Sequence, residues 1–231
     1  ASTDPDKKYG LILKYKIDGH AYESSIIISH SSENSFEQRI EMPAHYKELL
    51  TCRYLNPKFD FATSLDGLVD VIKNKDEEFI VNALRLIEPN IKDFVLSKNE
   101  VLVDIGLDKR IPINMMGDGA RKILSILTSI YECKNGIVLI DELSNGFHYS
   151  VMKGVWTSIV SVAKKNNVQI FATTHDLDSI KGLRDAAMSC EEYNNSIVCF
   201  KLHRTDNSEL KSYQYSLDSV DYSLNQEIEI R

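Results

Sequence analysis

The chain has 231 residues, of which 43% are hydrophobic, and its formal net charge is −7. This length can bury one large core or two small ones, and the negative charge gives no global attraction to nucleic acid. No apolar run approaches the roughly 18 residues that a membrane-spanning helix needs. The four cysteines lack the C-x-x-C spacing of a structural zinc site and fit a reducing compartment. Together these features predict a cytoplasmic protein without a membrane partner.

The first half of the chain shows two different patterns. Residues 1–35 contain two β-rich runs on either side of Asp18-Gly19, a dipeptide that favours a tight hairpin turn. Residues 36–100 then carry apolar residues at helical spacing, and Pro89 is expected to end the second of two helices. We therefore predict a β-hairpin segment followed by a helical subdomain.

Residues 101–231 form the third predicted region, and a glycine-rich segment lies near its start. Gly117, Asp118 and Gly119 precede a run of apolar residues at helical spacing, so the glycines are expected where a helix begins. Such a terminus exposes unpaired backbone N–H groups and the positive end of the helix dipole, which suits a phosphate group. Asp118 would avoid opposing that phosphate if its carboxylate capped the helix by accepting a backbone N–H.

Two short apolar runs, 136–140 and 169–172, have the β-branched composition of strands buried on both faces of a parallel sheet. Asp141 and Glu142 follow the first run, and a Thr-Thr pair and then His175 follow the second. Because ligands bind at the carboxyl ends of strands in open α/β sheets, we expect these side chains along one sheet edge. Adjacent Asp and Glu residues can divide the work of ATP hydrolysis, with Asp holding Mg²⁺ and Glu polarising the attacking water.

The order of these motifs resembles the C-terminal half of an ABC-type ATPase core. A Gly-Asp-Gly helix start is followed by a strand ending in Asp-Glu, a loop from Ser144 to His148, a helix and a strand ending in Thr-Thr-His. Within that superfamily the chain is similar to the AAA15/AAA21 and OLD-like ATPases, relatives of the SMC and DNA-repair ATPases. The resemblance covers residues 100–231 well and the earlier part loosely. It implies an α/β fold, the C-terminal lobe of a P-loop ATPase, with a mostly parallel sheet flanked by helices.

The same resemblance implies roles for individual residues. Asp141 would be the Walker B aspartate that holds Mg²⁺, Glu142 the catalytic glutamate and His175 the switch histidine that senses the γ-phosphate of ATP. Two loops would contact the nucleotide or shape a subunit interface: the signature loop of Gly117, Asp118 and Gly119, and the D-loop of Ser144, Asn145, Gly146 and His148. The chain departs from the usual pattern in having Gly117 for a Ser, Asp118 for a Gly, and Asp176 for the Ser after the histidine.

The sequence contains no G-x-x-x-x-G-K-[ST] loop, the pattern whose backbone amides and Lys cradle nucleotide phosphates. We therefore expect ATP and Mg²⁺ binding to need an N-terminal P-loop lobe that was removed, cleaved or separately encoded, so the chain alone would be inactive. The resemblance implies a homodimer or higher oligomer, with ATP sandwiched between the P-loop of one subunit and the signature loop of another. It also points to DNA maintenance or phage defence, with DNA or a nuclease as partner.

Two other readings of the sequence stay open. A TOPRIM-like Mg²⁺-dependent nuclease would use Glu142 with Asp176 and Asp178 as a carboxylate cluster. The glycine-rich helix start and His175 at the strand end favour the ATPase, because the nuclease needs neither. The third reading is a non-hydrolysing interaction module that retains only the fold.

Overall fold

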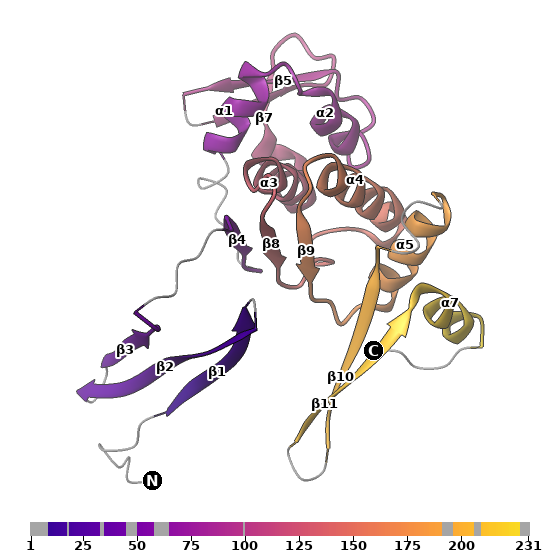
Figure 1. Cartoon of the computed structure of the whole chain (residues 1–231). Helices are drawn as coiled ribbons and strands as arrows, with labels where there is room; N and C mark the ends of the chain where they lie inside the picture. Colours follow the sequence, from indigo (N-terminus) through magenta and orange to yellow (C-terminus); the bar gives the residue numbers. More distant parts are fainter. Residues whose placement is uncertain are drawn as a thin grey trace. The chain divides into compact units, whose positions relative to one another are not determined.

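The structure is a computed structural model. It divides into two compact units, residues 1–49 and 50–231, which are drawn with their elements labelled in Figure 1. Within the parts that it describes, no helix combines the length and apolar character needed to cross a membrane. The described residues are 9–17, 19–32, 35–44, 50–57, 65–98, 100–190, 196–205 and 209–226.

The first unit contains a three-stranded antiparallel sheet of order β1-β2-β3. Its strands are β1 (Tyr9–Ile17), β2 (His20–Ser32) and β3 (Ser35–Glu41). The predicted hairpin is confirmed, because Ile17 pairs with His20 and Gly19 adopts a φ of 81° in the turn; Asp18 lies outside the described residues. The third strand falls in the region expected to be helical. Its pairing with β2, Ile26 opposite Ile40, explains this difference.

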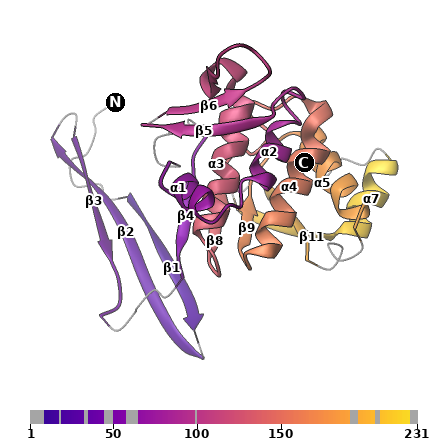
Figure 2. The same cartoon turned by 90° about the horizontal axis from the view of Figure 1, so that it is seen from above.

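The second unit is built around a three-stranded parallel sheet of order β4-β8-β9. Its strands are β4 (Cys52–Leu55), β8 (Ile137–Ile140) and β9 (Gln169–Ala172). Two long helices, α3 (Asp118–Glu132) and α4 (Met152–Lys165), pack beside these strands (Figures 1 and 2). Val138 and Ile140 of β8 are buried in the same cluster as the apolar stripes of both helices. The predicted α/β fold with a parallel sheet flanked by helices is therefore confirmed.

The opposite face of this sheet carries exposed side chains. Tyr54, Leu139 and Phe171 are direct neighbours across the three strands and form one row. Tyr54 is 59% exposed and Phe171 is 52% exposed, although both are large apolar side chains. The expectation that β8 and β9 are buried on both faces is therefore wrong: residues alternate between faces along a strand, and the described helices α3 and α4 pack on the face that carries Val138 and Ile140.

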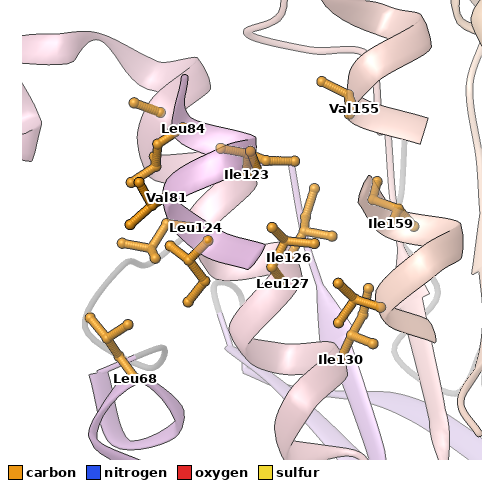
Figure 3. Close-up of a cluster of buried hydrophobic side chains, with 14 of the residues drawn as sticks. Leu68, Val81, Leu84, Ile123, Leu124, Ile126, Leu127, Ile130, Val155 and Ile159 are labelled. Atoms are coloured by element: carbon orange, nitrogen blue, oxygen red, sulfur yellow. The ribbon is translucent and has the colours of Figure 1, made fainter. Parts of the chain in front are cut away.

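A second layer of elements covers the outer side of α3. It comprises α1 (Leu65–Lys73), α2 (Glu78–Leu84), the 3₁₀ helix η2 (Ile113–Met116), and an antiparallel sheet of β5 (Asp93–Ser97), β6 (Glu100–Asp104) and β7 (Ile111–Pro112). Leu68, Val81 and Leu84 pack against the α3 side chains from Ile123 to Ile130 (Figure 3). The region 36–100 thus holds the two expected helices, and also β3, β4 and β5.

The remaining elements are one 3₁₀ helix between β8 and α4 and the elements that follow β9. They are the 3₁₀ helix η3 (Tyr149–Val151), α5 (Leu177–Met188), the antiparallel strands β10 (Val198–Arg204) and β11 (Leu210–Ser216), and α7 (Leu217–Asn225). Trp156 of α4 is buried, and its Nε1 donates to the carbonyl oxygen of Ser179 in α5 at 2.9 Å. This contact fixes α5, and hence the loop between β9 and α5, against α4.

Candidate functional site

The carboxyl ends of β8 and β9 bring the central sequence-predicted residues together. Asp141 and Glu142 directly follow β8, and His175 follows β9 after two threonines. The ladder continues past the strands, because Thr173 N–H donates to the Ile140 carbonyl at 2.9 Å and Asp141 N–H donates to the Leu55 carbonyl at 2.9 Å. The three side chains therefore start from a rigid edge, where open α/β sheets bind ligands.

Two hydroxyl groups orient the carboxylate of Asp141. Thr173 Oγ1 donates to Oδ1 at 2.5 Å, and Tyr54 OH donates to Oδ2 at 3.4 Å. The pKa of Tyr54 is raised, first by desolvation and then by the charge and hydrogen bond of Asp141. Asp141 is thus held by Tyr54 of β4 and by Thr173, the residue that directly follows β9.

Glu142 and His175 form a direct pair. His175 Nδ1 lies 2.7 Å from Glu142 Oε2. An ionised carboxylate can only accept hydrogen bonds, so Nδ1 carries the proton in this contact. The His175 side chain is 76% exposed and that of Glu142 is 32% exposed. A ligand at this edge can therefore reach the other ring nitrogen and the second carboxylate oxygen.

Thr173 is a site residue that the sequence analysis missed. Its Oγ1 donates to Asp141 and also accepts the Glu142 N–H at 3.0 Å. One hydroxyl thus links the side chain of the first acidic residue to the backbone of the second. The signal was present in the Thr-Thr pair before His175, but only the pairing of β8 with β9 shows which threonine faces Asp141.

Lys122 is the second residue that was missed. It lies on α3, is 7% exposed, and its Nζ donates to the carbonyl oxygens of Glu142 at 2.7 Å and Asn145 at 3.0 Å. Desolvation lowers its pKa to about 8, against the opposing effect of the Glu142 and Asp141 charges. The sequence gives no signal for this burial, because Ser125 and Ser129 on the same side of the helix are polar and only the structure shows them buried. A lysine in a helix otherwise suggests a solvated face.

The signature loop lies at the start of α3, as the sequence predicts, but Asp118 does not cap the helix. Gly117 occupies the N-cap position with a φ of 85°, and no side chain caps the first turn. Asp118 is one residue too late for that role, and its carboxylate pairs with Arg121 instead. The capping expectation is therefore wrong, although an acidic residue in the first turn still suits the helix dipole.

The D-loop contacts both the signature helix and the end of β9. Ser144 Oγ lies 3.0 Å from Thr174 Oγ1. A Cβ added at Gly119 would lie 2.9 Å from the carbonyl oxygen of Gly146, so α3 and this loop touch through their backbones. His148 turns back to the start of η3, where its Nδ1 lies 2.8 Å from Ser150 Oγ and accepts the Ser150 N–H.

The carboxylate cluster required by the nuclease reading does not form. Asp176 accepts the Asp178 N–H at 3.0 Å as the N-cap of α5, and Asp178 pairs with Lys181 at 3.4 Å. Among the described residues, which include Glu142, no group of three or more His, Cys, Asp or Glu side chains is arranged to hold a metal ion. The Asp-x-Asp pattern is explained by helix capping.

The strands and helices form a mixed α/β fold with a parallel sheet flanked by helices. The structure resembles an SMC head solved with the C-terminal winged-helix domain of ScpA, with a TM-score of 0.52 over 94% of this chain and 76% of that one. The sequence identity is 11%, so this likeness concerns the fold alone.

Residues 21–178 match the AAA15 family, described as an AAA ATPase domain, and the chain belongs to this family. It is 26% identical over 159 residues to an ATP/GTP phosphatase of Helicobacter pylori, which covers 67% of this chain and 43% of that protein. It is also 35% identical over 107 residues to an uncharacterized protein of Methanocaldococcus jannaschii, covering 46% of this chain and 89% of that one. The chain thus spans less than half of the Helicobacter relative.

Proposed function

We propose that this chain supplies the signature, Walker B, D-loop and switch-histidine elements of an ATP-hydrolysing molecular switch. The observation that carries the proposal is the 2.7 Å contact between His175 Nδ1 and Glu142 Oε2, made beside Asp141 at the carboxyl edge of the sheet. Membership of the AAA15 family supports ATP as the nucleotide. In this account Glu142 and His175 are catalytic residues and Asp141 is the metal ligand.

Glu142 is suited to activate the attacking water. His175 occupies Oε2, which leaves Oε1 to accept a hydrogen bond and then a proton from the water. The exposed ring of His175 can meanwhile contact the γ-phosphate through Nε2. One hydrogen bond therefore joins the proposed base, Glu142, to the proposed phosphate-sensing residue, His175.

Asp141 fits the protein ligand of Mg²⁺. Magnesium in phosphoryl-transfer sites uses one or two carboxylates and takes its other ligands from phosphates and water. Asp141 is one carboxylate fixed in orientation by Thr173 and Tyr54, which matches that need. When bound, the ion would neutralise negative charge on the phosphate oxygens.

A further lobe completes the site in this proposal. The sequence holds no P-loop pattern, so the amide cradle for the phosphates comes from another segment or chain, and this chain alone binds ATP weakly. The open sheet face at Tyr54, Leu139 and Phe171 supports such a lobe, because parallel sheets are normally covered on both faces.

The signature loop supports assembly into a dimer or higher oligomer. Gly117 to Gly119 begin a long helix whose first N–H groups suit an anion, and they pack on the D-loop rather than on Glu142 and His175. We infer that they contact ATP held by a second subunit. DNA or a nuclease as the partner rests on the family resemblance.

The metal role of Asp141 gives the first test. In the complete ATPase, Asp141→Ala should abolish the Mg²⁺-dependent part of ATP binding, because it removes the protein anchor of the ion. Glu142→Gln should retain that binding, since it keeps a hydrogen-bonding group of the same shape. Equilibrium binding of ATP with and without Mg²⁺ measures both. Unchanged Mg²⁺ dependence in Asp141→Ala would refute the assigned role.

A further inference from the structure

We propose that Lys122 is a positioning residue that fixes the backbone of Glu142, and so aims its carboxylate at His175 and the reacting water. The inference rests on the proposed function, since it assigns Lys122 a part in the same hydrolysis. Lys122 lies on the signature helix α3, whereas Glu142 follows β8, so the contact joins two elements that the proposal assigns to nucleotide binding and to catalysis.

Glu142 adopts a backbone conformation that needs support. Its φ is 50°, in the left-handed region that non-glycine residues seldom occupy. A non-glycine residue in this region is strained, and the conformation persists only where the surroundings enforce it. An extended backbone at Glu142 would point its side chain in another direction. The left-handed conformation therefore goes together with the contact between Glu142 and His175.

Four contacts enforce the turn, and two of them are made to the Glu142 carbonyl. The Glu142 N–H donates to Thr173 Oγ1 at 3.0 Å, and the Glu142 carbonyl accepts from Lys122 Nζ at 2.7 Å and from the Asn145 N–H at 3.1 Å. The next residue, Leu143, is fully buried and donates its N–H to the Thr173 carbonyl at 2.9 Å. Removing the lysine therefore leaves the Glu142 carbonyl with the longer hydrogen bond from Asn145, and it also frees the Asn145 carbonyl that Lys122 holds.

A buried lysine is an unfavourable choice if its side chain serves only to fill space. Burying an ammonium group is unfavourable unless it is paired and hydrogen-bonded. Lys122 Nζ meets two carbonyl oxygens and lies 5.8 Å from the centre of the Phe147 ring. An apolar side chain of similar length would fill this space at lower cost, so the retained ammonium group indicates a requirement for its hydrogen bonds.

The test is Lys122→Met in the complete ATPase, which keeps much of the side-chain length and removes the donor. We expect kcat to fall by about 10- to 100-fold, the scale seen when a catalytic group is misplaced by about 1 Å, with little change in KM. Lys122→Arg, which restores charge and donors, should recover part of the loss. Lys73→Met is the matched control, because Lys73 pairs with Asp70 on the exposed surface of α1.

A double variant separates positioning from general structural damage. If Lys122 acts through Glu142, Lys122→Met should cause no further loss of kcat in a Glu142→Gln background. A multiplicative loss in that background, or an unchanged kcat in Lys122→Met, overturns the inference. Should Lys122→Met not fold, Lys122→Gln, too short to reach both carbonyls, takes its place with the same expectations. Near-normal hydrolysis by Glu142→Gln itself would instead refute the proposed function.

Discussion

His175 contacts Glu142 through Nδ1, and this leaves Nε2 as the ring nitrogen that can contact a ligand. With Nδ1 donating to the carboxylate, Nε2 faces outward from a side chain that is 76% exposed. A contact from Nε2 to the γ-phosphate requires that nitrogen to be protonated as well. The positively charged ring would then interact with Glu142 through Nδ1 and with the phosphate through Nε2.

We predict that His175→Ala lowers turnover far more than it weakens ATP binding. The contact with the γ-phosphate should strengthen as charge develops in the transition state, so its loss should appear mainly in kcat. A fall of about 10²-fold is expected for one preorganised donor. Single-turnover kinetics and nucleotide titration measure the two effects, with His203→Ala on β10 as control. An equal loss in binding and turnover would contradict this role.

The residues of the site differ in how far sequence predicts them. Asp141, Glu142 and His175 could be found because each follows a short apolar run, and parallel strands end at one edge. Thr173 and Lys122 could not, because their roles depend on contacts with residues 32 and 20 positions away in the chain. Asp118 was assigned the wrong partner because the N-cap was placed one residue late.

At the scale of elements, the start of α3 and the D-loop approach each other through glycine. The carbonyl oxygen of Gly146 would lie 2.9 Å from a Cβ at Gly119, and this atom belongs to the backbone and cannot rotate away. The contact brings the signature loop against the turn that follows Glu142. A side chain at Gly119 should therefore disturb both loops at once.

We predict that Gly119→Ala lowers the free energy of unfolding by about 1–3 kcal/mol, the usual cost of overpacking. Gly154→Ala in α4 is the matched comparison, because its added methyl group would meet the side chain of Leu86, which can change rotamer. Alanine also has the better helix propensity there. Denaturant unfolding of the two variants beside the parent measures the difference. Equal stability of Gly119→Ala and the parent would exclude the tight contact.

Elements with strong local patterns were predicted, and elements defined by their partners were not. The hairpin β1-β2 has a turn dipeptide, β8 and β9 are continuous apolar runs, and α3 has apolar residues at helical spacing. Strand β4 was missed because only Leu55 of its residues is buried, and β8 supplies the hydrogen bonds that define it. Strand β3 likewise depends on pairing with β2.

At the scale of the whole molecule, the two faces of the parallel sheet differ in burial. Its inner face packs on α3 and α4, and its outer face presents Tyr54 and Phe171 to solvent. The composition of the strands could not predict this difference. A run of β-branched residues does not show whether the second face of the sheet is packed by this chain or by another one. The proposed P-loop lobe is the cover that would also complete the nucleotide site.

Glu142 has the central role in the proposed hydrolysis, because it is the base that activates the attacking water. Single-turnover ATP hydrolysis by the complete ATPase carrying Glu142→Gln tests this directly, measured beside the parent at saturating Mg-ATP. We predict that hydrolysis falls by about 10²-fold or more, the scale for loss of a positioned acid–base group, while ATP remains bound. Hydrolysis at a rate near that of the parent would contradict it.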